Sequence, residues 1–214
     1  MYVHPAFQTT RDRALLMLRE RGFGTFVVPN PDGPPSAVHV PFLIFEEGER
    51  LRVELHVARA NPLHTLIAAE GTHCLLCCMG PDAYISPEWY GAPNEVPTWT
   101  YTAVHLTGMT RLLPLAENRA HVGRMVATFE GRLANNAAPW TVEQVDPAKV
   151  AAMMQAIVSM EMIVDDVNAQ LKLIQHKDAV RHRGAIAGLR RQSDGGSHAI
   201  ADLMQATLDE RTSS

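Results

Sequence analysis

Several polar side chains fall where a predicted strand ends, and their types suit the binding of an anion. The sequence HVARANP, residues 56–62, brings His56, Arg59 and Asn61 to the end of one strand. Asn61 is a favoured helix N-cap and Pro62 suits the first helical position, so a short helix is expected to begin there. Because the N-terminus of a helix attracts anions, this corner predicts a phosphate site. A well-capped turn without a ligand is the alternative.

Further side chains have the chemistry that an anionic aromatic cofactor requires. Cations and amide donors hold a phosphate, and flat side chains cover a ring. Each also has a simpler interpretation: a core histidine donating to a carbonyl for His56, a surface ion pair for Arg59, and closure of a barrel end for the tryptophans. The additional candidates are His39 in the second strand, Ser86 and Trp89 in a long Pro-rich loop at residues 80–99, Trp99 and Tyr101 at the start of a long strand, and Lys172 and Gln175 in KLIQH.

Familiar catalytic devices are missing from the sequence. It contains no G-x-G-x-x-G after a strand, no P-loop, no H-E-x-x-H and no G-x-S-x-G. No histidine is tied to Ser86 by spacing, which disfavours a serine hydrolase. Cys74, Cys77 and Cys78 lie in HCLLCCMG without a second Cys or His pair, so we expect small buried residues of a strand and no metal site. On that strand Cys74 and Cys78 would share one face.

The composition is that of a globular protein with a sizeable core. The chain has 214 residues, of which 46% are hydrophobic and 20% charged, with a net charge of −4. This charge argues against a nucleic-acid-binding surface spread over the whole molecule. No run of about 18 apolar residues and no signal-peptide apolar region are present, so no membrane partner and a cytoplasmic location are expected.

The predicted elements favour an antiparallel β-barrel. Strands are closely spaced and their connections are short, apart from the helix after the third strand, which disfavours alternating β-α units. Pro41 predicts an edge or a bulge in the second strand. Strands are expected at residues 24–28, 36–45, 51–55, 72–79, 98–113 and 157–167, and after a turn residues 169–176 follow; helices are expected at 9–22, 63–69, 115–131, 146–156, 178–191 and 198–211.

Five motifs in order resemble the PaiB-type FMN-binding proteins. They are HVARANP, GPDAYISPEWY, VPTWTYTAVHLTG, KLIQH and RGAIAGL, and the opening MYVHPAF is similar as well. The likeness covers residues 1–190. It implies an α+β fold, the FMN-binding split β-barrel of pyridoxamine 5′-phosphate oxidases and flavin reductases, with peripheral helices in residues 1–176 and a helical C-terminal extension in residues 177–214. It also implies a homodimer with FMN at the subunit interface.

The resemblance also assigns roles to the candidate residues. The family usually reads KLSQN where this sequence has KLIQH, so Ile174 and His176 depart from the family pattern. The resemblance implies that His56, Arg59 and Asn61 face the phosphate and ribityl chain, that His39 and Val40 run along the isoalloxazine ring, that Ser86, Trp89 and Trp99 surround the flavin or its open face, and that Lys172 and Gln175 come in late, from this subunit or its partner.

Three functions follow from the resemblance and the residues. The first is an FMN-dependent oxidoreductase, and the second is a transcriptional regulator that uses flavin, or nothing, as a sensor. The third is a heme-binding or heme-degrading protein, with His39, His56 or His105 as ligand. No helix-turn-helix is evident; residues 177–191 hold five Lys or Arg against one Asp, which is typical of a solvated helix face but could contact DNA phosphates.

Overall fold

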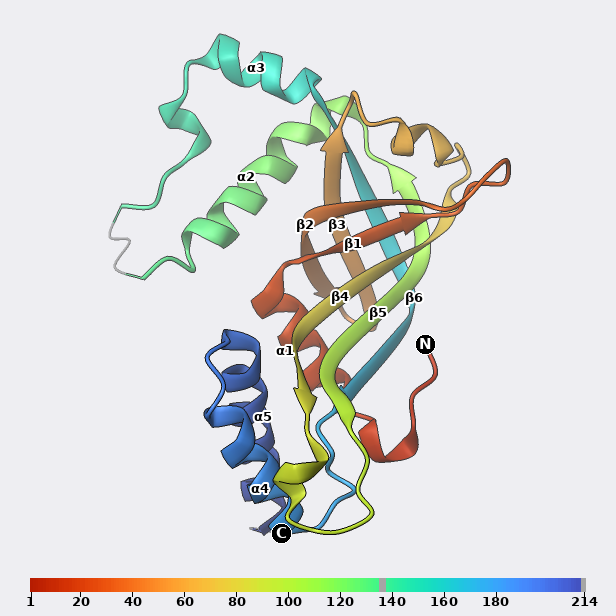
Figure 1. Cartoon of the computed structure of the whole chain (residues 1–214). Helices are drawn as coiled ribbons and strands as arrows, with labels where there is room; N and C mark the ends of the chain where they lie inside the picture. The colour runs from red at the N-terminus through yellow and green to blue at the C-terminus, as the bar shows by residue number, and fades with distance from the viewer. Residues whose placement is uncertain (135–137, 213–214) are drawn as a thin grey trace. The chain divides into compact units, whose positions relative to one another are not determined.

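Six strands close into a barrel in the order β1-β2-β3-β6-β5-β4 (Figure 1). The computed structural model describes residues 1–134 and 138–212. The β1–β2, β1–β4, β2–β3 and β3–β6 pairs are antiparallel. The α+β class and the barrel predicted from the sequence are therefore confirmed. The strands are β1 (Phe23–Val28), β2 (Ser36–Glu47), β3 (Arg50–Ala58), β4 (Thr72–Ile85), β5 (Thr98–Leu112) and β6 (Ile157–Lys172).

The barrel strands form because apolar and polar residues alternate along them. In β3, Leu51, Val53 and Leu55 are buried, while Arg52 lies on the opposite face. Pro41 lies opposite Phe23, where β2 stops pairing with β1 and begins to pair with β3. Its missing N–H therefore falls at the change of partner.

The helices agree with the sequence except after β3. The helix expected at residues 63–69 is a 3-10 helix of five residues, because Ile67 already has extended backbone angles. The α-helices are α1 (Arg11–Arg21), α2 (Asn118–Glu130), α3 (Pro147–Gln155), α4 (Ala179–Arg190) and α5 (Gly195–Thr212); the 3-10 helices are η1 (Pro5–Phe7), η2 (Pro62–Leu66), η3 (Pro87–Tyr90), η4 (Leu115–Glu117) and η5 (Val142–Gln144).

Two strands extend further than predicted. The loop expected at residues 80–99 is shorter, because β4 continues to Ile85 with Ala83 and Ile85 buried in alternation. The turn expected after residue 167 is also wrong, since β6 continues to Lys172. Asp165 and Asp166 are turn-forming residue types, but here their side chains are exposed on a continuous strand.

The chain divides into two compact units, each with its own core. Unit 1 comprises residues 1–17, 78–105 and 167–214, and unit 2 comprises residues 18–77 and 106–166. Strands β4, β5 and β6 contribute residues to both. The predicted domain boundary after residue 176 stays a prediction. Buried residues of unit 1 include Ile85, Tyr90, Leu173, Ile186, Leu189 and Met204, and those of unit 2 include Phe26, Val53, Leu55, Leu76, Leu106 and Met160.

The three cysteines lie in β4 as free thiols, and Cys74 and Cys78 are buried while Cys77 is half-buried. This agrees with the expected alternation. Within residues 1–134 and 138–212, no three His, Cys, Asp or Glu side chains are grouped so that they could hold a metal ion. No helix in that part of the chain is long and apolar enough to cross a membrane.

Candidate functional site

The end of β3 in unit 2 carries a hydrogen-bonded chain of three titratable side chains. His56 Nδ1 lies 2.9 Å from His121 Nε2, and the two rings meet edge to face. His121 Nδ1 lies 3.0 Å from Glu54 Oε2. His56 is therefore not a core histidine bonded to a carbonyl, as the simpler interpretation held. Burial, followed by the neighbouring His121, lowers the pKa of His56 to about 4.

Glu54 is a buried carboxylate with three cationic or polar partners. It accepts hydrogen bonds from Arg124 Nη2 at 2.9 Å and Arg124 Nε at 3.1 Å, and it also pairs with Arg52. Burial would raise the pKa of Glu54, but the hydrogen bonds from His121, Arg52 and Arg124 outweigh it and lower the pKa to about 2. The carboxylate is therefore ionised at neutral pH.

The site residues predicted from the sequence did not include Glu54, His121 and Arg124. One signal was present: Arg52, Glu54 and His56 recur at every second position of β3, so three polar side chains share its outer face. Helix α2 then places His121 and Arg124 three residues apart, on one side of the helix. The sequence does not show that α2 lies beside β3, and that placement brings these side chains together.

Arg59 is held by backbone carbonyls. Its Nε donates to Gln155 O at 2.6 Å and its Nη2 to Ile157 O at 2.9 Å, while the side chain remains exposed. A guanidinium has five N–H donors, so three remain for a ligand. The arginine is thus oriented by the ends of α3 and β6, and it forms no surface ion pair among the described residues.

Asn61 is the predicted N-cap, and its Oδ1 accepts from Leu63 N at 3.0 Å. Because η2 is only five residues long, little helix dipole supports an anion there.

His39 and Val40 are consecutive residues of β2 and face opposite ways. His39 Nδ1 lies 2.9 Å from Thr25 Oγ1 near the surface, whereas Val40 is buried in the core and offers a ligand its backbone alone.

In unit 1, Trp89 and Trp99 line a hollow of about 360 Å³. Trp99 is 56% exposed, and its ring centroid lies 6.1 Å from that of Tyr84. Ser86 does not face this hollow as a lining residue; its Oγ accepts from Glu88 N and caps η3. The remaining lining residues are Asp82, Ala83, Tyr84, Gln192, Asp194 and Ser197.

Lys172 and Gln175 lie at the end of β6 in unit 1. The ammonium of Lys172 is 5.9 Å from the centre of the Tyr101 ring. Gln175 is occupied by its own backbone: Oε1 accepts from Leu173 N at 2.8 Å and Nε2 donates to Leu171 O at 2.6 Å. These bonds close a turn in which Ile174 has a φ of 51°. Gln175 therefore shapes the turn in this structure.

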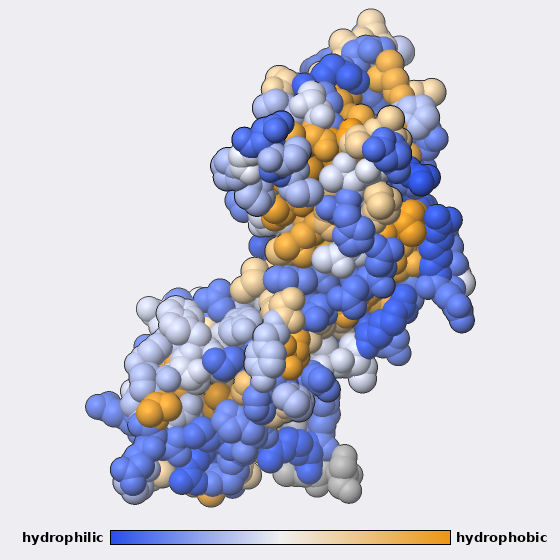
Figure 2. All heavy atoms as spheres, turned by 90° about the vertical axis from the view of Figure 1, so that its right-hand side faces the viewer, coloured by the Kyte–Doolittle hydropathy of each residue, from blue (hydrophilic) through white to orange (hydrophobic). Residues whose placement is uncertain are grey.

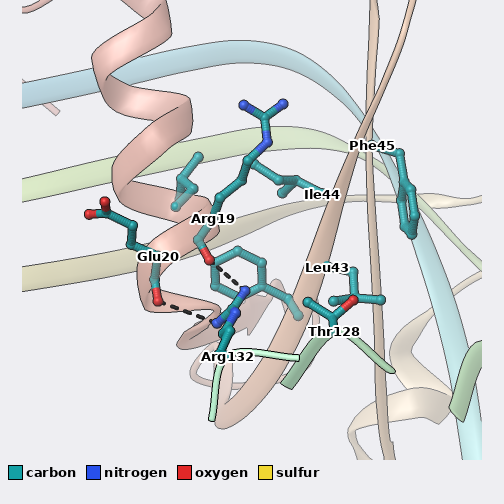
Figure 3. A pocket seen from close by; sticks show the side chains of 9 residues that line it. Arg19, Glu20, Leu43, Ile44, Phe45, Thr128 and Arg132 are labelled. Atoms are coloured by element: carbon teal, nitrogen blue, oxygen red, sulfur yellow. Dashed lines mark hydrogen bonds between the residues drawn. The ribbon is translucent and has the colours of Figure 1, made fainter. Parts of the chain in front are cut away.

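A larger hollow, of about 560 Å³, opens in unit 2 along α1, β2 and α2 (Figure 3). Arg132 donates to Arg19 O at 2.5 Å and Glu20 O at 3.3 Å, and so caps the last turn of α1. None of the residues predicted to bind FMN lines this hollow. The other lining residues are Leu18, Phe42, Leu43, Ile44, Phe45 and Thr128.

The predicted site residues divide evenly between the units. The end of β3 brings His56, Arg59 and Asn61 together, and the unit 1 hollow brings Trp89 and Trp99 together. Unit 2 holds His39, Val40, His56, Arg59 and Asn61; unit 1 holds Ser86, Trp89, Trp99, Lys172 and Gln175.

Comparison with known proteins decides the family. Residues 1–166 match the family described as "Putative FMN-binding domain". The chain belongs to this FMN-binding family. It is also 29% identical over 213 residues to the Bacillus subtilis "Protease synthase and sporulation protein PAI 2", covering 99% of this chain and all of that protein. The PaiB-type resemblance is thereby confirmed, and FMN is the cofactor that the family indicates.

Solved structures of similar fold bind related cofactors. The FAD and heme binding protein from Mycobacterium smegmatis has a TM-score of 0.55 at 16% identity, covering 85% of this chain and 79% of that one. The flavocytochrome Anf3 from Azotobacter vinelandii has a TM-score of 0.51 at 14% identity, covering 77% and 68%. At these identities the likeness establishes the fold of this FMN-binding family member alone.

The residues present fit FMN in chemical type. The unused donors of the oriented Arg59 suit a phosphate, and the ammonium of Lys172 forms no ion pair among the described residues. The exposed indole of Trp99 offers a flat wall. Within unit 2, Arg59 has the donors that a phosphate needs, and within unit 1, Trp99 has the flat face that a ring needs.

Proposed function

We propose that this chain is a homodimeric FMN-binding protein of the flavin oxidoreductase type. The observation that carries the proposal is the family match over residues 1–166. Bound FMN would supply the electron-transfer chemistry, so no catalytic triad is required of the protein. The chain's own part is to bind and orient the cofactor, with Arg59 holding the phosphate.

A second copy of the chain is the proposed partner. In unit 1, β4 exposes Met79 and Tyr84, the following loop exposes Val96, and β5 exposes Trp99. Apolar side chains also interrupt the polar surface on the face seen in Figure 2. Exposed apolar patches are typical of protein interfaces.

The three free thiols suit a reducing compartment, which supports the proposed cytoplasmic location.

The experiment is flavin binding followed by reduction. Purified protein should carry flavin absorbance or bind added FMN with a micromolar or lower Kd in calorimetry. A nicotinamide donor under anaerobic conditions should then bleach the bound flavin faster than it bleaches free FMN. Colourless protein that does not bind FMN would refute the proposal. A new Soret band on heme titration, lost in one His→Ala variant, would favour the heme alternative instead.

The second candidate is a flavin-linked regulator, favoured by the full-length similarity to PAI 2, whose name contains the words "protease synthase and sporulation". Much of the basic stretch at residues 177–191 is engaged within unit 1: Lys177 and Arg181 pair with Glu95, and Arg190 lies 3.7 Å from Asp202. A shift of specific promoter DNA that survives competitor DNA and salt of about 200 mM would support this function. Bound flavin that no donor reduces would favour it over the oxidoreductase.

A further inference from the structure

We propose that Glu54, His121 and His56 form a proton-transfer chain whose open end, His56 Nε2, is an acid–base group. The inference goes beyond FMN binding, because it needs only residues of unit 2. Its substrate would be any bound group that gains or loses a proton on nitrogen or oxygen.

The direction of the hydrogen bonds follows from Glu54. An ionised carboxylate can only accept, so His121 must carry its proton on Nδ1, which lies 3.0 Å away. In a neutral ring, His121 Nε2 is then an acceptor. It lies 2.9 Å from His56 Nδ1, which must donate. The remaining lone pair is on His56 Nε2.

This lone pair is accessible. His56 Nε2 has no hydrogen-bond partner in residues 1–134 and 138–212, and it is not among the buried unpaired atoms of that part of the chain. His121, by contrast, is fully buried with both ring nitrogens engaged. The chain therefore has one closed end, at Glu54, and one open end.

A proton can pass along the chain with every bond accounted for. It binds His56 Nε2 and forms a new N–H bond there. The proton on His56 Nδ1 moves to His121 Nε2, so His56 becomes neutral again in its other tautomer. His121 now carries the single positive charge, 3.0 Å from the Glu54 carboxylate that keeps accepting from its Nδ1–H. The reverse sequence delivers a proton from His56 Nε2.

The surroundings favour one positive charge and disfavour a second. Glu54 faces Arg52 on its own strand and Arg124 on α2, and Arg52 also pairs with Glu47 at 3.0 Å. With the Glu161 carboxylate of β6 counted, these three carboxylates and two guanidiniums carry a formal charge of −1 when both histidines are neutral. On β6, Glu161 lies opposite Glu54, and the uncharged Ser159 lies opposite His56.

Two unpaired polar atoms lie on neighbouring positions of the fold, one on β6, which pairs with β3, and one on α2, which carries His121. Ser159 Oγ of β6 and Asn118 Oδ1 of α2 are buried without a hydrogen-bond partner. Such atoms commonly bind an internal water. A water here would provide polar solvation for the transferred proton without adding charge.

The test is imidazole nitrogen NMR on the full chain without added cofactor, from pH 8 to 4. At pH 8, His56 and His121 should both be Nδ1–H tautomers. When the pair takes up one proton, both His121 nitrogens should become protonated while His56 switches to the Nε2–H tautomer. A charge that stays on His56, with His121 neutral, would overturn the proposal, as would an Nε2–H tautomer of His56 at pH 8.

Variants provide a second readout. Glu54→Gln should reduce the proton affinity of the pair roughly tenfold or more, because the anion beside His121 is lost. His73→Gln, which removes a surface histidine paired with Asp165, is the matched control and should change nothing at the pair. An unchanged proton affinity in folded Glu54→Gln would also overturn the proposal. The tautomer measurement uses the unmodified protein, so it stands even if this variant fails to fold.

Discussion

At the scale of the residue, Arg59 has two tasks that a single substitution can separate. Two of its N–H groups hold the carbonyls of Gln155 and Ile157, and three remain for the FMN phosphate. We expect Arg59→Ala to weaken FMN binding roughly ten- to a hundredfold, the value of a charge-assisted hydrogen bond of about 1.5–3 kcal/mol. Calorimetry with FMN and with riboflavin measures the effect.

Riboflavin is the control ligand because it lacks the phosphate, and its affinity should barely change. Equal losses for both ligands would mean that Arg59 only maintains local structure. Arg59→Lys keeps the charge but loses the bidentate backbone contact, so it should retain more FMN affinity than alanine.

The half-buried His56 and the buried Glu54 each predict a loss of stability in acid. The pKa of His56 is about 4 in the folded protein and 6.5 in the unfolded chain, so the unfolded chain binds this proton more readily. The contribution of His56 to stability is therefore fully present above pH 6.5 and is lost as the pH falls to 4. The 2.5-unit difference corresponds to at most roughly 3 kcal/mol. For Glu54, with a pKa of about 2 against 4.5, stability is lost as the pH falls from 4.5 toward 2.

Urea unfolding at pH 7, 6, 5 and 4 measures the histidine contribution. The free energy of unfolding should fall steadily over this range, and His56→Gln should flatten the slope. His73→Gln is the control, because His73 is exposed and takes no part in the hydrogen bonds that join Glu54, His121 and His56. A His56→Gln slope equal to that of the unmodified protein would contradict the prediction.

Features set by neighbouring residues could be predicted from the sequence. Contacts between residues far apart in the sequence could not. The cap at Asn61 follows from two adjacent residues, and the structure contains it. The contact between His56 and His121 joins residues 65 apart in sequence. It depends on how α2 lies over β3, and hydrophobic periodicity does not determine that placement.

At the scale of the element, α4 is shaped to fit against η3. Gly184 and Gly188 are one helical turn apart, and a Cβ at either would lie 2.2 Å from Trp89, from its carbonyl oxygen and its ring respectively. Gly188→Ala and Gly184→Ala should therefore destabilise unit 1 by roughly 1–3 kcal/mol through overpacking. Thermal unfolding followed by Trp fluorescence tests this.

Gly123 of α2 provides the matched control, since a Cβ there meets nothing within 4 Å. Gly123→Ala should stabilise the protein by roughly 0.5–1 kcal/mol, as alanine does in an open helix interior. If the α4 variants behaved like Gly123→Ala, the close contact with Trp89 would be refuted.

Element types were predicted better than element ends. The strands expected at residues 72–79 and 157–167 exist, but they continue to Ile85 and Lys172. In β4 the residues Gly80 and Pro81 suggested a loop, and in β6 a turn was predicted after Val167. Strand pairing outweighed these local preferences, as tertiary context commonly does.

At the scale of the whole molecule, the proposed dimer would bury apolar side chains that are exposed in the single chain. Met79 is 47% exposed on β4. Placing a charge there should oppose association, because an interface would bury it without a partner. We expect Met79→Glu to weaken the dimer at least about tenfold in Kd, as sedimentation over a range of concentrations would measure.

Val180→Glu is the comparison variant, since Val180 is 69% exposed and belongs to α4, not to the strands that expose Met79 and Trp99. It should leave the association unchanged. An unmodified protein that sediments as a monomer at all concentrations would refute the dimer.

The barrel could be predicted because the first four strands are closely spaced with short connections, which disfavours alternating β-α units. The assignment of the predicted residues to two compact units could not be predicted from the sequence. Each of these residues was placed only by the end of its own strand. Arg59 and Trp99 therefore each have a known local setting, in unit 2 and unit 1 respectively.

The placement of the cysteines in β4 has a practical use. Burial raises the pKa of Cys74 and of Cys77, and Cys78 is fully buried. Since thiolates are the species that react with maleimides, native thiols of this kind label slowly. A single cysteine introduced at an exposed position such as Val180 could then carry a spectroscopic probe without removal of the native ones, and distances between probes would report directly on association.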